Sequence, residues 1–301
     1  MAVKAYVVLN PVAGQSDPDE IRTLLNRAHE QGLWDFDLYE TTGDEDLKQV
    51  VSDALQEDYD MIVACGGDGT VSGVADGLAH SGVPMGVLPG GTVNAFAIEM
   101  DMPDSIEESL SILLGQHEIR QVDAIESDGR FYLLYCSLGF SSASINAVSR
   151  EEKDQLGWLA YMSNAIQKSF ESEPIYVKIE VDGQVKEYKA HEVLVFNTDQ
   201  IGVIDEHIGL DIKLDDGLLD IYVVRSGNLW DVIHSFFNQL IGKSEKAPYI
   251  QHRAIQKYVR IETNPVLKYQ ADGDIKGETP VTLQVARGAL KVIAKSKQAQ
   301  S

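Results

Sequence analysis

The sequence predicts an α/β domain with a doubly wound parallel sheet, followed by an antiparallel, β-rich domain of sandwich type. Two observations support this prediction. Over roughly the first hundred residues, short apolar runs alternate with segments whose apolar residues recur at helical spacing, which is typical of a parallel sheet covered by helices. Beyond about residue 120, strand-like segments follow one another with short turns between them, as in antiparallel sheets.

The elements of the first part alternate regularly. Strands are expected at Val3–Leu9 and at residues 34–39, 61–65 and 85–88, and helices at residues 17–31, 46–56, 71–79 and 104–114. Ser16 or Asp17 can cap the first helix, and Pro18 suits its first turn. Asp104 and Glu107 are expected to form a capping box at the start of the last helix.

The second part is dominated by strand signals. Strands are expected at residues 131–137, 175–181, 185–189, 193–197, 220–224, 258–262 and 281–285, and helices at residues 156–169 and 229–241. Asp182-Gly183 lies between two alternating runs and is a strong hairpin turn signal. The predicted domains are residues 1–122, with residues 289–301 as a candidate for a returning segment, and residues 123–288.

The composition suits a globular protein and argues against several classes. The chain has 301 residues, of which 44% are apolar, and a formal net charge of −22. This acidity argues against a nucleic-acid binder and against strong attraction to an anionic membrane. The apolar runs are too short for a transmembrane segment, and a strand follows Met1 so closely that no signal peptide is expected. Cys65 and Cys136 lie in apolar runs, which favours reduced thiols and a cytoplasmic protein.

Three glycine-rich segments follow predicted parallel strands. They are Asn10-Pro11-Val12-Ala13-Gly14, Gly66-Gly67-Asp68-Gly69-Thr70 and Pro89-Gly90-Gly91-Thr92-Val93-Asn94. The carboxyl ends of parallel strands meet at one edge of a sheet, where such folds bind their ligands. Glycine lets the backbone approach phosphate oxygens closely, and a following helix N-terminus offers free N–H groups. Three such loops at one edge predict a site for nucleotide phosphates.

Three acidic segments have more than one interpretation from the residues alone. Asp68 inside a phosphate-binding loop repels the ligand unless Mg2+ bridges the two or the carboxylate accepts a proton, and it could also simply stabilise a turn. Taken by themselves, Asp215-Asp216-Gly217 and Asp272-Gly273 are typical of turns.

Taken together, these motifs resemble the diacylglycerol kinase and sphingosine kinase superfamily, and most of all its soluble bacterial lipid kinases. The family's GGDGT loop matches Gly66 to Thr70, and its P-x-G-T-x-N-x-F-A element matches Pro89 to Ala97. The similarity continues through the second half, so that it covers about residues 6 to 295. Further matches in the family's order are Asn10 to Gly14, Leu156 to Tyr161, Asp216 to Asp220, and Asp272-Gly273-Asp274.

The resemblance implies a lipid kinase that uses ATP and Mg2+. It implies ATP contacts from Asn10, Pro11 and Gly14, from Thr41 or Thr42, from Gly66, Gly67, Asp68, Gly69 and Thr70, and from Gly91, Thr92 and Asn94. It also implies a structural Mg2+ bound by the Lys213 carbonyl, the Asp216 side chain and the Leu218 carbonyl. Asp274 takes the position of the family's proton acceptor, with Asp272 as supporting or alternative base and Asp68 as a further catalytic candidate.

The match has departures, and other functions therefore stay open. Val71-Ser72-Gly73 replaces the family's usual x-N-E after the first motif, and Ala95 replaces a common Asp. The leading hypothesis is phosphoryl transfer from ATP to a lipid hydroxyl, with diacylglycerol as the family's default substrate. The alternatives are an NAD kinase, which shares the Gly-Asp loop, and a nucleotide-binding regulator without catalysis. The expected partner is a lipid at a membrane surface, contacted transiently from the cytoplasm, and a homodimer is one oligomeric state to consider.

Overall fold

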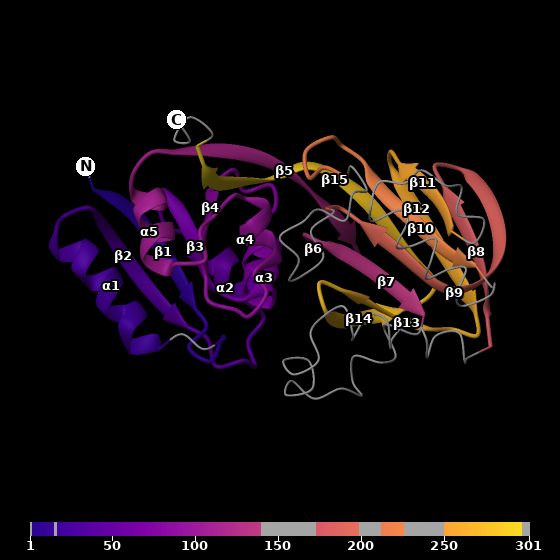
Figure 1. Cartoon of the computed structure of the whole chain (residues 1–301), viewed down its shortest axis with the longest axis horizontal. Helices are drawn as coiled ribbons and strands as arrows, with labels where there is room; N and C mark the ends of the chain where they lie inside the picture. The colour runs from indigo at the N-terminus through magenta and orange to yellow at the C-terminus, as the bar shows by residue number, and fades with distance from the viewer. Residues whose placement is uncertain (1, 15–16, 140–172, 199–211, 226–249, 297–301) are drawn as a thin grey trace. The chain divides into compact units, whose positions relative to one another are not determined.

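The computed structural model describes residues 2–14, 17–139, 173–198, 212–225 and 250–296. The chain divides into two compact units. Unit 1 comprises residues 1–122 and 288–301, and unit 2 comprises residues 123–287 (Figure 1). The helices predicted at residues 156–169 and 229–241 lie outside the described residues. Among the described residues, no helix is long and apolar enough to cross a membrane.

Unit 1 contains the predicted parallel sheet. Its strands are β1 (Val3–Leu9), β2 (Trp34–Glu40), β3 (Met61–Gly66) and β4 (Pro84–Pro89), in the order β2-β1-β3-β4. Every residue of β3 is buried, as expected for a strand covered on both faces. The last part of β15 (Val281–Lys295) pairs with β4 in parallel, at Lys291 and Val292. The carboxyl end of the chain therefore contributes a strand to unit 1.

The helices of unit 1 begin at identifiable caps. They are α1 (Pro18–Glu30), α2 (Leu47–Ala54), α3 (Asp68–Leu78), α4 (Ala95–Glu99) and α5 (Ile106–Leu114). Asp17 caps α1 by accepting the Asp19 N–H, and Asp46 caps α2 in the same way through Lys48. The capping box predicted at Asp104 is wrong, because Ser105 is the cap of α5 and accepts the Glu108 N–H. The prediction also placed the start of α3 three residues late and omitted α4.

Unit 2 consists of antiparallel strands. They are β5 (His117–Ser127, which begins in unit 1), β6 (Arg130–Tyr132), β7 (Tyr135–Gly139), β8 (Ile175–Val181), β9 (Gln184–Phe196), β10 (Leu219–Arg225), β11 (Ile250–Ile255), β12 (Tyr258–Asn264), β13 (Lys268–Ala271), β14 (Asp274–Glu278) and the first part of β15. The long strand β9 pairs with β8 along its first half and with β7 and β10 along its second half. Buried residues from these strands form a large core cluster, and Phe196, Ile212 and Tyr222 form a smaller one.

The described strands confirm the predicted class of unit 2 and correct several details. Asp182-Gly183 forms the predicted hairpin turn between β8 and β9. Residues 131–137, predicted as one strand, belong to β6 and β7, which are separated at Leu133 and Leu134. The two strands predicted at 185–189 and 193–197 are the single strand β9. Cys65 and Cys136 are free and buried.

Candidate functional site

The three glycine-rich loops all follow neighbouring parallel strands of unit 1. They begin at Asn10 after β1, at Gly66 at the end of β3, and at Pro89 at the end of β4. From β1 the chain crosses to β2 on one side, whereas β3 and β4 lie on the other side. The strand order therefore reverses between β1 and β3, and this is where open α/β sheets bind their ligands.

The backbones of these loops touch one another. A Cβ atom added to Gly14 would lie 2.2 Å from the Gly90 carbonyl oxygen, and one added to Gly91 would lie 2.5 Å from the Gly67 Cα. The Gly90 N–H donates to the Gly66 carbonyl at 2.9 Å. Because no side chain fits between them, the glycines at these positions are required for the three loops to meet.

Polar side chains fix the loops in this arrangement. The Asn10 amide nitrogen donates to the buried Thr70 hydroxyl at 3.2 Å. The Asn94 side chain accepts the Gly91 N–H at 2.8 Å and donates to the Gly91 carbonyl at 3.0 Å. Asn10, Thr70 and Asn94 were predicted as nucleotide contacts. Their side chains are engaged within the protein, so that they shape the loops.

Helix α3 starts inside the second loop and contains three glycines. Gly73 and Gly77 lie against α2, since added Cβ atoms would come within 2.7 Å of Leu47 and 2.5 Å of Val51. Gly69, in the first turn, is exposed, and an added Cβ would meet no atom within 4 Å. The first turn of a helix offers unpaired N–H groups that bind anions. Packing thus explains two of the three glycines and leaves Gly69 unexplained.

Asp68, the acidic member of the same loop, is partly buried. Its carboxylate accepts the N–H of Phe96 in the first turn of α4 at 3.2 Å. Asn94 precedes that helix with a left-handed backbone, φ 55°, and makes no side-chain cap bond to it. Asp68 therefore fixes the start of α4 and at the same time keeps a carboxylate in the glycine loop.

The other three threonines of the predicted nucleotide site differ in their surroundings. The Thr42 hydroxyl donates to Glu45 at 2.7 Å, and this bond is the largest cause of the lowered pKa of Glu45. Thr41 lies at the end of β2, where its N–H donates to the Leu9 carbonyl. Thr92 is exposed, and in the described part of the chain its hydroxyl has no hydrogen-bond partner. Thr92 is thus an exposed threonine whose hydroxyl is available to a ligand.

In unit 2, the predicted bases Asp272 and Asp274 have different environments. The Asp272 carboxylate accepts the N–H groups of Leu133 at 2.7 Å, Leu134 at 2.9 Å and Tyr135 at 3.2 Å. The Asp274 carboxylate is exposed and lies 3.2 Å from the Lys276 ammonium group. The same short motif therefore places one carboxylate against the backbone and the other in solvent.

The segment predicted to hold Mg2+ forms a tight acidic loop. Asp216 accepts the Leu218 N–H at 2.9 Å, and the buried Asp123 accepts the Gly217 N–H at 2.6 Å. Loss of surrounding water raises the pKa of Asp216, and the Leu218 bond, which lowers it, does not offset this. Repulsion by Asp220, Asp123 and Asp215 raises it further. Among the described residues, no three His, Cys, Asp or Glu side chains group around a metal position. The loop fits a cation held by one carboxylate and main-chain carbonyls, because a positive charge would relieve this repulsion.

Asn197 has a structural role that the sequence did not reveal. Its side chain is fully buried and donates to the Asp123 carbonyl at 3.0 Å and to the Leu133 carbonyl at 2.8 Å. It thereby joins the acidic loop around Asp216 to the segment bound by Asp272. The only sequence signal is an amide after the apolar end of β9, which is too common to identify such a role.

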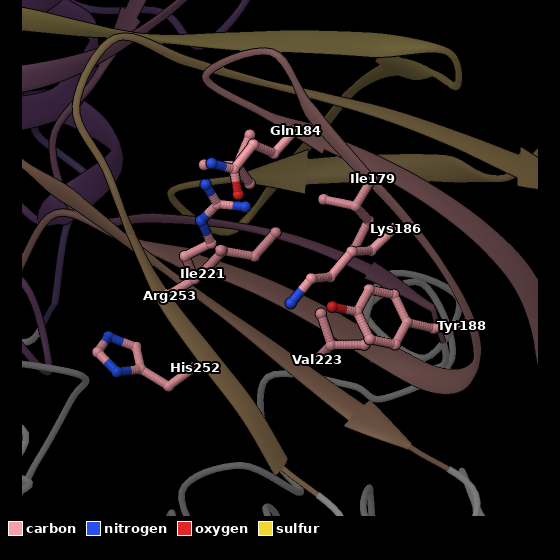
Figure 2. Close-up of a pocket in the computed structure, with 9 residues that line it drawn as sticks. Ile179, Gln184, Lys186, Tyr188, Ile221, Val223, His252 and Arg253 are labelled. Carbon is pink, nitrogen blue, oxygen red and sulfur yellow. The ribbon is translucent and has the colours of Figure 1, made fainter.

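A pocket in unit 2 contains none of the predicted site residues (Figure 2). It has an apolar floor on β8 and β10, and the side chains of Lys186 and Arg253 extend into it. In the described part of the chain, residues 184–189 of β9 pair only with β8, and β11 pairs only with β10. Charged side chains that point inward from edge strands hinder pairing with another chain. Among the described strands, Lys186 and Arg253 therefore lie on segments with one paired neighbour, where they can hinder such pairing.

Two family models match the chain. The diacylglycerol kinase catalytic domain matches residues 4–127. The YegS C-terminal NAD kinase beta sandwich-like domain matches residues 136–294. Together they cover unit 1 up to β5 and nearly all of unit 2.

Individual relatives agree with these models over almost the full length. The chain is 27% identical to a diacylglycerol kinase of Staphylococcus carnosus, covering 93% of this chain and 91% of the relative. It is 28% identical to an uncharacterized protein of Synechocystis, covering 96% and 70%. A crystal structure of a diacylglycerol kinase from Bacillus anthracis superposes with a TM-score of 0.77 at 27% identity, covering 98% of both chains. The chain therefore belongs to the diacylglycerol kinase-like family of lipid kinases, with the family's catalytic domain followed by a YegS-type C-terminal domain.

Proposed function

We propose that this protein transfers the γ-phosphoryl group of ATP to a lipid hydroxyl, with diacylglycerol as substrate and phosphatidic acid as product. The observation that best supports ATP binding is the exposed Gly69 in the first turn of α3, beside the touching loops of β1 and β4. The family match supports a lipid as acceptor. The exposed Thr92 hydroxyl adds a further donor for phosphate oxygens.

The residues of the chain have distinct roles in this proposal. The glycine loops let their backbone approach the phosphates closely, and the N-terminal end of α3, where Gly69 is exposed, faces them with its N–H groups. A structural Mg2+ would have the Lys213 carbonyl, Asp216 and the Leu218 carbonyl as its candidate ligands in the acidic loop. Mg2+ that accompanies ATP would neutralise phosphate charge. The acceptor hydroxyl oxygen bonds to the γ-phosphorus, while the bond to the β,γ-bridging oxygen breaks and ADP leaves. The Asp274 carboxylate takes the hydroxyl proton.

Gly69→Ala is expected to weaken ATP binding without weakening the fold. An alanine in the first turn of α3 would raise stability by up to about 1 kcal/mol, because glycine is a poor helix residue. Its methyl group would occupy the space that a phosphate must approach, and we expect the Kd for ATP to rise at least about tenfold. Calorimetric titration and thermal unfolding measure the two effects.

Gly73→Ala is the matched control in the same helix. Its methyl group would collide with Leu47 and lower stability, while the loop that precedes the helix stays unchanged. Gly69→Ala should therefore weaken ATP binding without loss of stability, whereas Gly73→Ala should lower stability without weakening ATP binding. An unchanged affinity in Gly69→Ala would contradict the assignment of the loop to phosphate.

Mg2+ is expected to stabilise the protein more at neutral than at acidic pH. The folded-state pKa of Asp216 is raised, so the native state binds more protons than the unfolded state above the ordinary pKa. The free energy of unfolding therefore falls as pH rises from the ordinary pKa of aspartate to the raised pKa of Asp216. A cation that favours the ionised carboxylate offsets this loss. The increase in Tm on adding Mg2+ should be larger at about pH 7.5 than at about pH 5.

Two variants test the origin of that stabilisation. Asp216→Asn should abolish the Mg2+-dependent increase in Tm, because it removes the proposed ligand. Asp215→Asn removes the same charge from the neighbouring exposed side chain and should keep most of the increase. Equal responses of Asp216→Asn and the unmodified protein would exclude this loop as the Mg2+ site.

A lipid panel with γ-radiolabelled ATP tests the proposed reaction directly. Diacylglycerol, other lipid alcohols and NAD are offered in parallel, each with and without Mg2+. We expect label in phosphatidic acid. Label in NADP but in no lipid would favour an NAD kinase, and ATP binding without any transfer would favour a regulator. Co-sedimentation with liposomes tests the proposed transient contact of a cytoplasmic protein with a membrane surface.

A further inference from the structure

Two hairpins of unit 2, far apart in the sequence, have the same type of turn. Asp182-Gly183 joins β8 to β9, and Asp272-Gly273 joins β13 to β14. The two turns have nearly the same backbone, with φ of 49° and 84° at the first and 47° and 91° at the second. These positive angles suit a two-residue hairpin of type I′, in which Asp and Gly are common.

The two aspartates also make the same four hydrogen bonds. The Asp182 carboxylate accepts the N–H groups of Gln256, Lys257 and Tyr258 at 2.9, 2.9 and 3.1 Å, and its own N–H donates to the Tyr258 carbonyl at 3.1 Å. The Asp272 carboxylate accepts those of Leu133, Leu134 and Tyr135, and its own N–H donates to the Tyr135 carbonyl at 3.0 Å. Each carboxylate thus holds three successive residues at the start of a strand.

The turn alone does not require this carboxylate. A third Asp-Gly turn, Asp128-Gly129, has φ of 50° and 74°. In the described part of the chain, the Asp128 carboxylate has no hydrogen-bond partner. The hydrogen bonds of the Asp182 and Asp272 carboxylates are therefore not needed to form the turn. They connect each hairpin to a neighbouring segment.

A carboxylate that accepts three backbone N–H groups is well suited to fix two segments together and poorly suited to accept a proton. Three N–H donors stabilise the ionised carboxylate, and protonation would break at least one of these bonds. Asp182 shows the effect: burial by itself would raise its pKa, but the bonds from Gln256, Tyr258 and Lys257 outweigh burial and lower it. Asp274 has no such donors among the described residues, because its carboxylate is exposed and is bound only by Lys276.

The location of Asp272 connects it to Asp274. Ala271 pairs with Asp274 across the hairpin, so the turn at Asp272 sets where β14 begins. On its other side, the segment at Leu133 is held by Asn197, which also binds the Asp123 carbonyl. Fixing residues 133–135 to the turn therefore fixes the first residue of β14.

We infer that Asp272 is a positioning residue that holds the hairpin bearing Asp274, and that it is not the proton acceptor. This inference rests on the proposed phosphoryl transfer to a lipid. Asp272 thus holds its hairpin against a neighbouring segment as Asp182 does, and the hairpin at Asp272 carries the proposed base, Asp274.

Asparagine and alanine variants of the three aspartates separate the two roles. An asparagine at 272 keeps an oxygen that can accept two of the three N–H groups, whereas an alanine keeps none, and neither can take a proton. For a positioning residue, kcat should fall about tenfold in Asp272→Asn and about a hundredfold in Asp272→Ala. For Asp274, the Asn and Ala variants should both lose at least about a hundredfold. Asp182→Asn and Asp182→Ala should lower Tm as much as their counterparts at 272 and leave kcat unchanged.

The outcomes are distinguishable. Equal, near-complete loss in Asp272→Asn and Asp272→Ala, with Tm matched to the Asp182 variants, would make Asp272 the base and overturn the inference. Full activity in both, or equal loss of kcat at 182 and 272, would also overturn it. If Asp272→Ala does not fold, Asp272→Asn decides alone by comparison with Asp274→Asn. If the unmodified protein phosphorylates no lipid in the panel, the proposed function fails and the positioning role fails with it.

Discussion

Asp274→Asn is expected to reduce the kcat of lipid phosphorylation by at least about a hundredfold, because general-base catalysis contributes about 10²–10⁴ to such rates. The change is nearly isosteric and removes the ability to accept a proton, together with an exposed ion pair to Lys276 that contributes little to stability. Asp274 is exposed at the start of β14, so its replacement should leave Tm unchanged. Initial rates with saturating ATP and diacylglycerol micelles, together with thermal unfolding, measure both quantities. The KM for ATP should not change, since the glycine loops of unit 1 are unaltered.

Two further variants make this result specific. Glu278→Gln removes another exposed carboxylate from β14 and should retain full activity. Asp274→Glu keeps a carboxylate at this position and should retain most of the activity. If Asp274→Asn is as active as the unmodified protein, the base must be sought elsewhere, with Asp68 as the next candidate.

The first unit could be predicted closely from the sequence because its signals are local. Strand β1 has the predicted bounds, and Asp17 is one of the two predicted caps of α1. Buried parallel strands are continuous apolar runs, and caps and glycine turns lie within a few residues of the helices they end. The errors in this unit are the late start of α3, the omission of α4 and the cap of α5. At α5, two adjacent residues could both serve as the cap, and the sequence pattern favoured Asp104, whereas the structure has Ser105.

The second unit was less predictable because distant residues determine its details. The strand expected at residues 131–137 is interrupted because Asp272 binds the N–H groups of Leu133 to Tyr135, and up to 139 residues separate these partners. A periodicity of hydrophobic residues contains no information about such bonds. For the same reason, the motif alone left Asp272 as an alternative to Asp274 for the base.

The departure of Val71-Ser72-Gly73 from the family pattern has a partial structural explanation. Gly73 lies where α3 meets α2, and an added Cβ would come within 2.7 Å of Leu47. A larger residue there would push the two helices apart, so the glycine allows their close contact. The structure gives no reason for Ser72 to replace the family's usual asparagine.

Gly14→Ala is expected to disrupt the nucleotide site more strongly than any other single alanine in these loops. Its backbone is left-handed, φ +61°, and an added Cβ would lie 2.2 Å from the Gly90 carbonyl oxygen. The left-handed backbone costs an alanine about 1–2 kcal/mol. The collision with a backbone atom, which cannot be relieved by rotating a side chain, adds about 1–3 kcal/mol. The loops after β1 and β4 must separate, and the Kd for ATP should rise by more than about a hundredfold.

Gly32→Ala is the matched control, because it adds the same backbone strain without a collision. Gly32 follows α1 with φ +70°, and an added Cβ would meet no atom within 4 Å. This variant should lose about 1–2 kcal/mol of unfolding free energy and keep its ATP affinity. Urea unfolding gives the difference between the two variants, which isolates the effect of the contact between Gly14 and Gly90. If Gly14→Ala loses no more stability than Gly32→Ala and binds ATP normally, the loops after β1 and β4 do not form one phosphate-binding surface.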